Sequence, residues 1–470
     1  MDELKTDILV IGAGSGGLSV AAGAAQMGAD VTLLEGGQMG GDCLNYGCVP
    51  SKTLIASAKR AQAMRDAADF GIAPVEPRVD YAAVMDRVRR TIAAIAPVDS
   101  QERFEGLGCR VIRDWGRFTG PDTVEAGGRA IRARRIVIAT GSSPAVPDID
   151  GLDAVPYLTN ETLWDLREAP DHLLILGGGP IGIEMAQAHR RLGCRVTVIE
   201  GGTIMGKEDP EMVAVIRDRL RAEGVEIREG ARVERVSGQA GAITLHADGG
   251  DVAGTHLLVA TGRRPNLERL NLDAAGIAHE GGLTVGDDLR TSNRRVYAVG
   301  DAAGRLQFTH VAGYHGSTVI RSIVLGLPAK VRQDHIPRVT YTDPELAQVG
   351  LTEAQAREAH GSKLSVVRVP YDQNDRAEAE GATTGLLKAM VVGGKPVGVS
   401  IAGDKAGELI GLWALVLANG LPLRAVAGMV APYPTLGELS KRAAGQYFAP
   451  KLFENRWVER AVGVVQRLVP

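Results

Sequence analysis

The sequence predicts an α/β fold with two similar βαβ units and a C-terminal α+β domain. Residues 7–35 and 172–200 repeat one order of apolar strand, glycine loop, helix, glycine, strand and acidic residue. A second pair of matching segments follows, IVIATG at 136–141 and LLVATG at 257–262. From about residue 335 the pattern changes to short β-branched runs joined by a glycine turn, which is typical of hairpins. The 470 residues also exceed what one hydrophobic core supports.

These signals divide the chain into consecutive segments. We expect the first βαβ unit over 1–147, the second over 148–270, a return to the first unit over 271–335, and the C-terminal domain over 336–470. The segment 50–105 is rich in alanine and arginine with helical periodicity, and predicts two helices packed on the first unit. In the last domain we expect strands over 364–370 and 386–403, followed by helices over 405–418 and 435–446.

Composition predicts a cytoplasmic protein with neither a nucleic-acid partner nor a membrane span. The net charge is -3, from 53 Lys+Arg against 56 Asp+Glu, and no basic cluster offsets it. The first ten residues are acidic and enter a strand at once, unlike a signal peptide. The apolar stretch Leu409–Ala418 is too short to cross a bilayer and predicts a buried helix. Only four cysteines occur, which excludes a disulfide-stapled secreted scaffold.

The first glycine loop follows the apolar strand Ile8–Ile11 and opens a helix. Gly12 permits the tight turn, Gly14 lets a pyrophosphate approach the backbone, and Gly17 allows close packing of helix on strand. The helix N-terminus then faces the phosphates. Glu35 ends the second strand, where its carboxylate can accept hydrogen bonds from a ribose diol. The unit is therefore predicted to be a Rossmann-like dinucleotide-binding domain.

The second loop, Gly177-x-Gly179-x-x-Gly182, also follows an apolar strand and opens a helix. The strand after that helix ends in Glu200. A carboxylate here hydrogen-bonds a ribose 2′-OH and repels a 2′-phosphate, so NADH is preferred to NADPH. The alternative of a 2′-phosphate stays open because three arginines lie nearby, namely Arg190, Arg191 and Arg195.

Two closely spaced cysteines indicate redox chemistry. Cys43 and Cys48 are five positions apart, a rise of about 7.5 Å on an ideal helix and too far for an easy disulfide. Asn45 and Gly47 between them allow the backbone to leave helical geometry. A disulfide across such a distortion is expected to be strained and reducible. A disulfide that served only to stabilise the fold would contribute little, because it would close so short a loop. A metal site would need more ligands.

Cys109 and Cys194 are expected to be small buried residues.

The segment GGDCLNYGCVPSKTL resembles the redox motif of the flavin-dependent class I pyridine nucleotide-disulfide oxidoreductases, the family of dihydrolipoamide dehydrogenase, glutathione reductase and mercuric reductase. The resemblance covers essentially the whole chain in the family's order: glycine loop, CxxxxC, ATG, second glycine loop, GRRPN at 262–266, VGD at 299–301 and a C-terminal interface domain. It implies that the first unit binds FAD, the second binds NAD(P), and the last domain forms a homodimer.

The resemblance also implies roles for single residues. Cys48 would be the charge-transfer thiol beside the flavin and Cys43 the outer thiol that attacks the substrate. Lys52 would lie near flavin N5, paired with Glu184 from the second loop. The segment 308–312 resembles a helix start that points at the flavin. The implied FAD contacts are Gly12, Gly14, Gly17, Glu35, Asp42, Lys52, Thr140, Gly141, Asp301 and His310, and the implied NAD contacts are Gly177, Gly179, Gly182, Glu200 and Gly262.

The C-terminal region departs from the family pattern. The disulfide reductases usually carry a histidine there, with a glutamate five residues later, as an acid–base pair. Here Glu438 is in place, but Tyr433 stands where the histidine is expected, and all nine histidines lie at or before His360. A phenol with a pKa of about 10 is a poor base at neutral pH, although it can donate a hydrogen bond or bind a metal.

Mercuric reductases have a tyrosine at the corresponding position, so the sequence is closest to mercuric-reductase-like members. Those enzymes also carry a C-terminal cysteine pair that delivers Hg(II), whereas no cysteine follows Cys194 here.

The sequence thus predicts a homodimeric FAD enzyme without a resident metal. It would transfer electrons from NADH through FAD to the Cys43–Cys48 disulfide, and on to a small-molecule disulfide or a soft metal ion. The alternatives are a mercuric reductase, a dihydrolipoamide dehydrogenase, which Tyr433 disfavours, and a redox-sensing flavoprotein.

Overall fold

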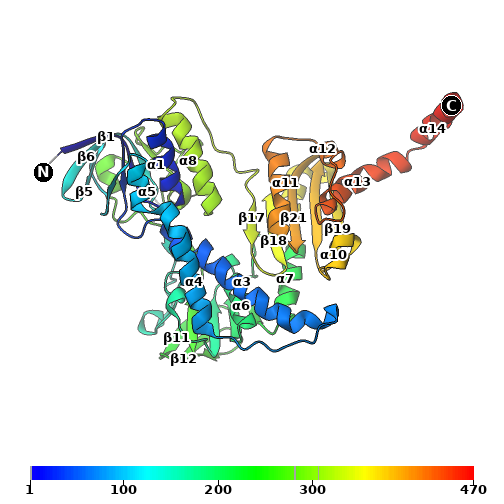
Figure 1. Ribbon diagram of the computed structural model, residues 1–470, viewed down its shortest axis with the longest axis horizontal. Helices are drawn as coiled ribbons and strands as arrows, with labels where there is room; N and C mark the ends of the chain where they lie inside the picture. Colours follow the sequence, from blue (N-terminus) through cyan, green and yellow to red (C-terminus); the bar gives the residue numbers. More distant parts are fainter. Residues whose placement is uncertain (1–2, 280–281, 305, 470) are drawn as a thin grey trace. The chain divides into compact units, whose positions relative to one another are not determined.

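The structure is a computed structural model that describes residues 3–279, 282–304 and 306–469. The chain forms two compact units. The first contains residues 1–65, 75–201 and 226–332, and the second contains residues 66–74, 202–225 and 333–470. Figure 1 labels the helices and strands.

The first unit contains a seven-stranded sheet with its apolar strands at the centre. Its order is β3-β2-β1-β6-β5-β4, with β16 paired to β6. The pairs among β3, β2, β1, β6 and β16 are parallel, whereas β4, β5 and β6 pair antiparallel. Helices α1 (Ser15–Gln26) and α8 (Thr309–Ile323) pack against each other. The strands are β1 (Glu3–Ile11), β2 (Val31–Leu34), β3 (Arg110–Ile112), β4 (Arg117–Gly120), β5 (Thr123–Ala126), β6 (Arg129–Ile138) and β16 (Val296–Ala298).

A second parallel sheet in the same unit repeats this plan. Its order is β10-β9-β8-β14, and α6 (Pro180–Arg191) follows β8 through the second glycine loop. A three-stranded meander of β11, β12 and β13 and a short pair of β7 with β15 complete the unit. The strands are β7 (Ser142–Pro144), β8 (His172–Leu176), β9 (Arg195–Glu200), β10 (Glu226–Glu229), β11 (Val233–Gln239), β12 (Ala242–Ala247), β13 (Val252–Gly254), β14 (His256–Val259) and β15 (Arg263–Pro265).

The two glycine loops adopt the same backbone conformation. Gly12 has a φ of 106° and Gly177 a φ of 111°, in the region that disfavours other residues. A Cβ on Gly12 would lie 2.4 Å from the carbonyl oxygen of Ala139, and one on Gly177 would lie 2.5 Å from that of Ala260. The repeat predicted from the sequence is therefore confirmed down to the atoms that each first glycine contacts.

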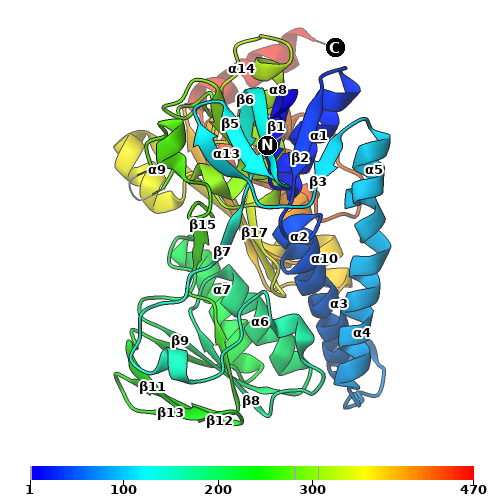
Figure 2. The ribbon, with the colours of Figure 1, turned by 90° about the vertical axis from the view of Figure 1, so that its left-hand side faces the viewer.

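Cys43 and Cys48 lie on two helices that follow the first βαβ unit. Helix α2 (Gly41–Asn45) is followed by α3 (Cys48–Arg65), and α4 (Tyr81–Ile95) packs along α3 (Figure 2). Helix α3 also packs against α6. The prediction of two long helices in this segment is confirmed, and a short third helix, α5 (Gln101–Gly106), follows them.

The second unit is built on a five-stranded antiparallel sheet of order β17-β18-β21-β20-β19. Helix α11 (Ala406–Ala418) lies on β18 and β21 (Figure 1), and α13 (Glu438–Phe453) packs on β19 and β20. The strands are β17 (Arg338–Thr340), β18 (Glu345–Gly350), β19 (Leu364–Pro370), β20 (Leu386–Val392) and β21 (Lys395–Gly403), and the other helices are α7 (Pro210–Ala222), α9 (Glu353–His360), α10 (Asp375–Ala379), α12 (Leu423–Ala427) and α14 (Arg456–Leu468).

The predicted elements of the last domain are present, with two differences. The hairpin of β20 and β21 and the helix at 406–418 match the expectation. The expected burial of Leu409–Ala418 holds for one face only: Trp413 is fully buried, whereas Leu415 is 58% exposed. Helix α13 begins at Glu438 and continues to Phe453, seven residues beyond the expected end. Gly445 lies beside the expected end but inside the helix, without the positive φ of a helix-ending glycine, so the helix continues past it.

A buried ion cluster ties α7 to the sheet of the second unit. The ammonium group of Lys388 on β20 is 2% exposed and lies 2.8 Å from Asp209, 2.6 Å from Glu211 and 2.9 Å from Glu353. Asp209 also caps α7 by accepting a hydrogen bond from the backbone N–H of Glu211. Removing one partner of such a buried cluster would leave charge uncompensated. This interaction accounts for the grouping of residues 202–225 with the second unit.

Candidate functional site

The two cysteines face each other across a break between two helices. Helix α2 ends at Asn45, and α3 begins at Cys48. Gly47 lies close to Asp42 in this turn: a Cβ there would lie 2.8 Å from a carboxylate oxygen and 3.1 Å from the backbone oxygen of Asp42, so a larger residue would have to displace it. No disulfide joins Cys43 and Cys48 in this structure. The predicted departure from helical geometry between the cysteines is confirmed.

The surroundings of the pair favour negative charge on Cys48. A hydrogen bond from Cys43, the Thr309 hydroxyl and the Lys52 ammonium together lower the pKa of Cys48 to about 6, against the opposite effect of burial. The same hydrogen bond, together with burial, raises the pKa of Cys43. Thr309 Oγ1 lies 3.2 Å from Cys48 Sγ, so its hydroxyl can donate to a thiolate. The arrangement therefore holds a thiolate at Cys48 and a thiol at Cys43 near neutral pH.

An ion pair connects the cysteine helix to the second glycine loop. Lys52 Nζ on α3 lies 2.7 Å from a carboxylate oxygen of Glu184 on α6. The Glu184 side chain is buried, whereas the Lys52 side chain is 37% exposed. Helix α6 opens from the second glycine loop, so this pair links the cysteine helix to the second nucleotide-binding motif through side chains. The pairing expected from the family resemblance is present.

The start of α8 completes the surroundings of Cys48. Thr309 is the first residue of that helix, and its contact with Cys48 joins positions 261 apart in the sequence. His310, which was expected to contact a cofactor, is exposed and stacks on Phe308 with ring centroids 5.3 Å apart. His310 was predicted from the sequence, whereas Thr309 was not. The available signal was that Thr309 is the first polar residue of a helix N-terminus.

An arginine bridges two carboxylates near the cysteine turn. Arg263 lies 3.0 Å from Asp42 and 3.9 Å from Asp301. Asn160 donates a hydrogen bond of 3.0 Å to Asp42, and the Ser142 hydroxyl donates one to Asp301. Burial raises the pKa of Asp301, while Ser142 and Arg263 act in the opposite direction. Asp42 and Asp301 were predicted, whereas Arg263, Ser142 and Asn160 were missed.

The glycine loops leave open space where a bound phosphate requires it. A Cβ on Gly14 would meet only the Cα of Gly41, at 3.8 Å, and a Cβ on Gly179 would meet nothing within 4 Å. By contrast, a Cβ on Gly17 would lie 1.8 Å from the Gly12 carbonyl oxygen, and one on Gly182 would lie 2.1 Å from that of Gly177. The middle glycine of each loop thus lies against open space, and the third packs helix on strand. These cradles fit two dinucleotides.

The glutamate side chains at the ends of β2 and β9 point toward the two glycine loops. Glu35 accepts hydrogen bonds of 2.6 Å from the backbone N–H groups of Ala13 and Gly37. Glu200 accepts one of 2.7 Å from the N–H of Gly178. Each carboxylate is therefore held beside its glycine loop, where a ribose would lie, and each oxygen retains further acceptor capacity.

The two ATG segments occupy the ends of their strands. The Thr140 hydroxyl donates a hydrogen bond of 2.7 Å to the carbonyl oxygen of Asn266. Gly141 and Gly262 both have positive φ, at 68° and 139°. These contacts fasten the GRRPN segment to the first ATG segment, which places Arg263 beside Asp301 and Asp42.

Tyr433 and Glu438 belong to the second unit. Tyr433 is 71% exposed, and its hydroxyl donates a hydrogen bond of 2.9 Å to a carboxylate oxygen of Asp375. This bond to Asp375 raises the pKa of Tyr433. Glu438 is the first residue of α13. Asp375 was missed in the sequence because nothing in its surroundings indicates a partner 58 positions away.

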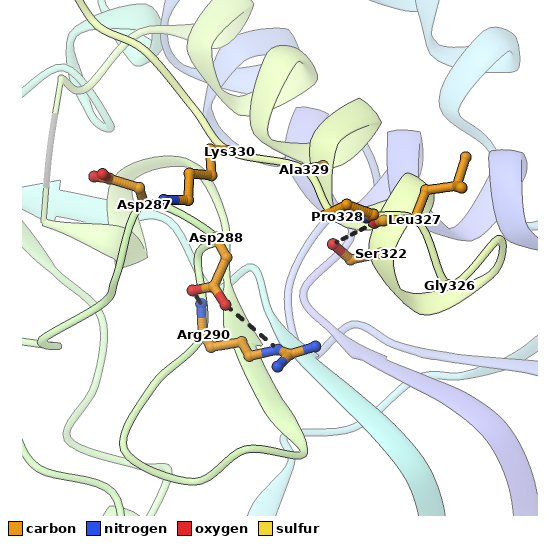
Figure 3. A pocket seen from close by; sticks show the side chains of 9 residues that line it. All are labelled: Asp287, Asp288, Arg290, Ser322, Gly326, Leu327, Pro328, Ala329 and Lys330. Carbon is orange, nitrogen blue, oxygen red and sulfur yellow. Dashed lines mark hydrogen bonds and ion pairs between the residues drawn. The ribbon is translucent and has the colours of Figure 1, made fainter.

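A surface pocket of about 560 Å³ lies elsewhere on the first unit. Figure 3 shows its lining, which includes Asp288 paired with Arg290 and the Ser322 hydroxyl directed at the carbonyl of Leu327. Ser322 lies thirteen positions after Thr309 on α8, about 20 Å along the helix. The pocket is therefore remote from the cysteines. Across residues 3–279, 282–304 and 306–469, no cluster of three or more His, Cys, Asp or Glu side chains is arranged to hold a metal ion.

Comparison with known proteins identifies the family. A family model described as pyridine nucleotide-disulphide oxidoreductase matches residues 6–316, and the model of the corresponding dimerisation domain matches residues 336–444. The mercuric reductase of Lysinibacillus sphaericus is 34% identical over 455 residues, covering 94% of this chain and 83% of the relative. The mercuric reductase of Streptomyces lividans is 36% identical over 456 residues, covering 93% and 95%.

Two solved structures are also similar. The copper(II) complex of the HOCl-induced flavoprotein disulfide reductase RclA from Escherichia coli has a TM-score of 0.84 and 28% identity, and covers 94% of this chain and 99% of that chain. LpdA from Mycobacterium tuberculosis has a TM-score of 0.86 and 27% identity, with the same coverage.

The glycines of the second loop give a matched pair of variants. Gly179→Ala should leave thermal stability unchanged, because the added Cβ meets no atom within 4 Å, but should weaken NADH binding at least about tenfold by obstructing the phosphates. Gly182→Ala should lower the melting temperature by several degrees, because its Cβ would clash with a backbone oxygen. Thermal unfolding and NADH titration measure both effects. Equal NADH affinity in Gly179→Ala and the unmodified protein would contradict the prediction.

Proposed function

The chain belongs to the pyridine nucleotide-disulphide oxidoreductase family, and we propose that it transfers electrons from NADH through FAD and the Cys43–Cys48 pair to a soft metal ion or a disulfide. The chain is an oxidoreductase of the flavoprotein disulfide reductase type, and this family uses FAD and NAD(P)H. The observation that carries the proposal is the thiolate-stabilising arrangement around Cys48.

Bound FAD would supply two-electron transfer between the nicotinamide and the cysteines. The groups proposed to hold it are the first glycine loop, Glu35, the Thr140–Gly141 turn and Asp301. The cradle at Gly14, the orientation of Glu35 and the bridge from Arg263 to Asp301 all support this assignment. Lys52, fixed by Glu184, would provide positive charge beside a reduced cofactor and beside Cys48.

The two cysteines are proposed to have different tasks. Cys48 holds the negative charge, stabilised by Cys43, Thr309 and Lys52, and is assigned to the cofactor side of the pair. Cys43 keeps its proton until the pair reacts, because hydrogen bonding and burial raise its pKa. It is assigned to contact the acceptor, with transfer of its proton accompanying the reaction.

We propose a soft metal ion as the favoured acceptor. The relatives described above are named mercuric reductases, and the RclA structure is described as a copper(II) complex. Tyr433 supports this choice because its hydrogen bond to Asp375 raises a pKa that is already too high for a general base at neutral pH. A dithiol–disulfide reaction needs such a base more than ligand exchange at a metal does. A homodimer is also proposed, from the match to a dimerisation domain.

The assignment of the two cysteines predicts a pH-dependent spectrum. The Cys43→Ser holoenzyme should show a long-wavelength charge-transfer band without added reductant, since Cys48 is then permanently free and serine keeps a hydrogen-bond donor. The band should fade as pH falls through about 6, because protonation removes the thiolate. Thr309→Val should move the midpoint to higher pH. An oxidised flavin spectrum from neutral to alkaline pH in Cys43→Ser would refute the assignment, and Cys48→Ser is the control without a band.

Glu200 predicts the preferred nucleotide. The kcat/KM for NADH should exceed that for NADPH by about tenfold or more, because the carboxylate can bond the ribose 2′-OH and repels a 2′-phosphate. Glu200→Ala should reduce this ratio, mainly by improving the use of NADPH. Steady-state kinetics with both nucleotides provide the measurement. A preference of the unmodified protein for NADPH would instead implicate Arg190, Arg191 or Arg195.

Tyr433 predicts which acceptors are reduced well. Tyr433→His should increase lipoamide turnover, by up to 10²–10⁴-fold if the lipoyl group can enter, because it supplies general acid–base catalysis. It should not increase Hg(II) reduction. Tyr433→Phe should lower metal reduction if the phenol oxygen helps to bind the ion, and Asp375→Ala serves as the control for loss of its hydrogen-bond partner. Lipoamide turnover by the unmodified protein equal to that of Tyr433→His would overturn the proposed acceptor.

A further inference from the structure

The C-terminal helix α14 lies outside the part of the chain that the family accounts for. The dimerisation-domain match ends at residue 444, whereas α13 continues to Phe453 and α14 spans Arg456–Leu468 (Figure 1). Helix α14 is a defined element with its own cap, since the Asn455 side chain accepts a hydrogen bond from the backbone N–H of Trp457. None of its residues is buried.

The two faces of α14 differ sharply in chemistry. At 100° per residue, its apolar side chains fall within an arc of about 160° and its polar side chains fall on the remainder. The apolar side chains are strongly exposed, with Trp457 at 75%, Val462 at 52% and Leu468 at 76%. The apolar face consists of Trp457, Val458, Ala461, Val462, Val464, Val465 and Leu468, and the polar face of Arg456, Glu459, Arg460, Gly463, Gln466 and Arg467.

Exposed apolar side chains also lie at the end of α13. Leu452 and Phe453 are 51% and 77% exposed, and with Phe448 they border an apolar groove of about 400 Å³. A 13-residue helix is marginally stable alone in water. Its exposed apolar stripe therefore needs a surface that buries it.

Charge identifies the kind of surface. Residues 441–469 contain six basic and two acidic side chains, in a protein whose net charge is -3. A local excess of positive charge beside exposed apolar side chains complements an anionic lipid surface. The wide apolar arc also fits the plane of a bilayer better than the narrower seam of a helix pair. Helix α14 is about 20 Å long and carries four charged residues, so it is suited to lie in the interface, and no helix described here is long and apolar enough to cross a membrane.

We propose that α14, together with Leu452 and Phe453, binds the surface of an anionic phospholipid membrane. Trp457 and the aliphatic side chains would enter the boundary between headgroups and acyl chains, while Arg456, Arg460 and Arg467 contact the phosphates. The enzyme would then act at a membrane surface. This docking is independent of the reaction catalysed, because no residue of α14 belongs to the proposed site.

The test uses the full-length, FAD-loaded protein and sedimentation with vesicles. Vesicles of equal parts phosphatidylglycerol and phosphatidylcholine should bind the protein, and vesicles of phosphatidylcholine alone should bind it much less. Binding should weaken as salt rises. Changing Arg456, Arg460 and Arg467 to Gln should lower the partition coefficient about fivefold for each charge removed.

A matched pair of variants separates the apolar face from net charge. Val465→Asp and Gln466→Asp add the same charge at adjacent positions, on the apolar and polar faces respectively. Val465→Asp should lower partitioning at least about tenfold more than Gln466→Asp, while NADH oxidation in solution is unchanged in both. Equal losses in the two variants would overturn the proposal, as would absence of vesicle binding at low salt. It would also be overturned if Val465→Asp lowered the oligomeric mass without vesicles, because a second copy of the chain would then cover α14.

Discussion

A negative charge on Cys48 is the feature on which the rest of the site depends. The thiolate is stabilised by a hydrogen bond from Cys43, by the hydroxyl of Thr309 at the start of α8, and by the ammonium of Lys52. These groups come from three helices, and each helix is fixed by a different part of the first unit. Lys52 is held by buried Glu184, so the position of the positive charge depends on the helix that opens from the second glycine loop. A site that must hold charge on one sulfur and a proton on the other thus requires both nucleotide-binding motifs to be folded.

The two glycine loops use the same backbone arrangement to form two binding sites. In both loops the first glycine lies against the carbonyl of the ATG strand and the third against the carbonyl of the first. The middle glycine alone faces open space. The same division of tasks at both positions follows from the backbone, since each clash involves a main-chain oxygen that cannot move independently. Differences between the sites therefore arise from side chains outside the loops, such as Lys52 and Arg263.

The second unit is organised by charge as well as by apolar packing. Lys388 is buried among Asp209, Glu211 and Glu353 and fastens α7 to the central sheet. Tyr433 is fastened to Asp375 in a similar way, which fixes the phenol as a hydrogen-bond donor and raises its pKa. The same unit carries the C-terminal helix α14, none of whose residues is buried. The second unit thus combines an interior held by buried ion pairs with an exposed apolar helix face, which we propose binds a membrane surface.

The sequence by itself determined the features that depend on neighbours along the chain. The two βαβ units, the glycines with positive φ and the helix break between Cys43 and Cys48 follow from local spacing, and Tyr433 in place of a histidine follows from the resemblance to the family pattern. The tertiary structure alone decided which side chains meet: Thr309 with Cys48, Arg263 with Asp42 and Asp301, and Asp375 with Tyr433. The reason is physical. Periodicity and turn chemistry act over a few residues, whereas these contacts join positions 38 to 261 apart, which only the packing of helices and sheets brings together.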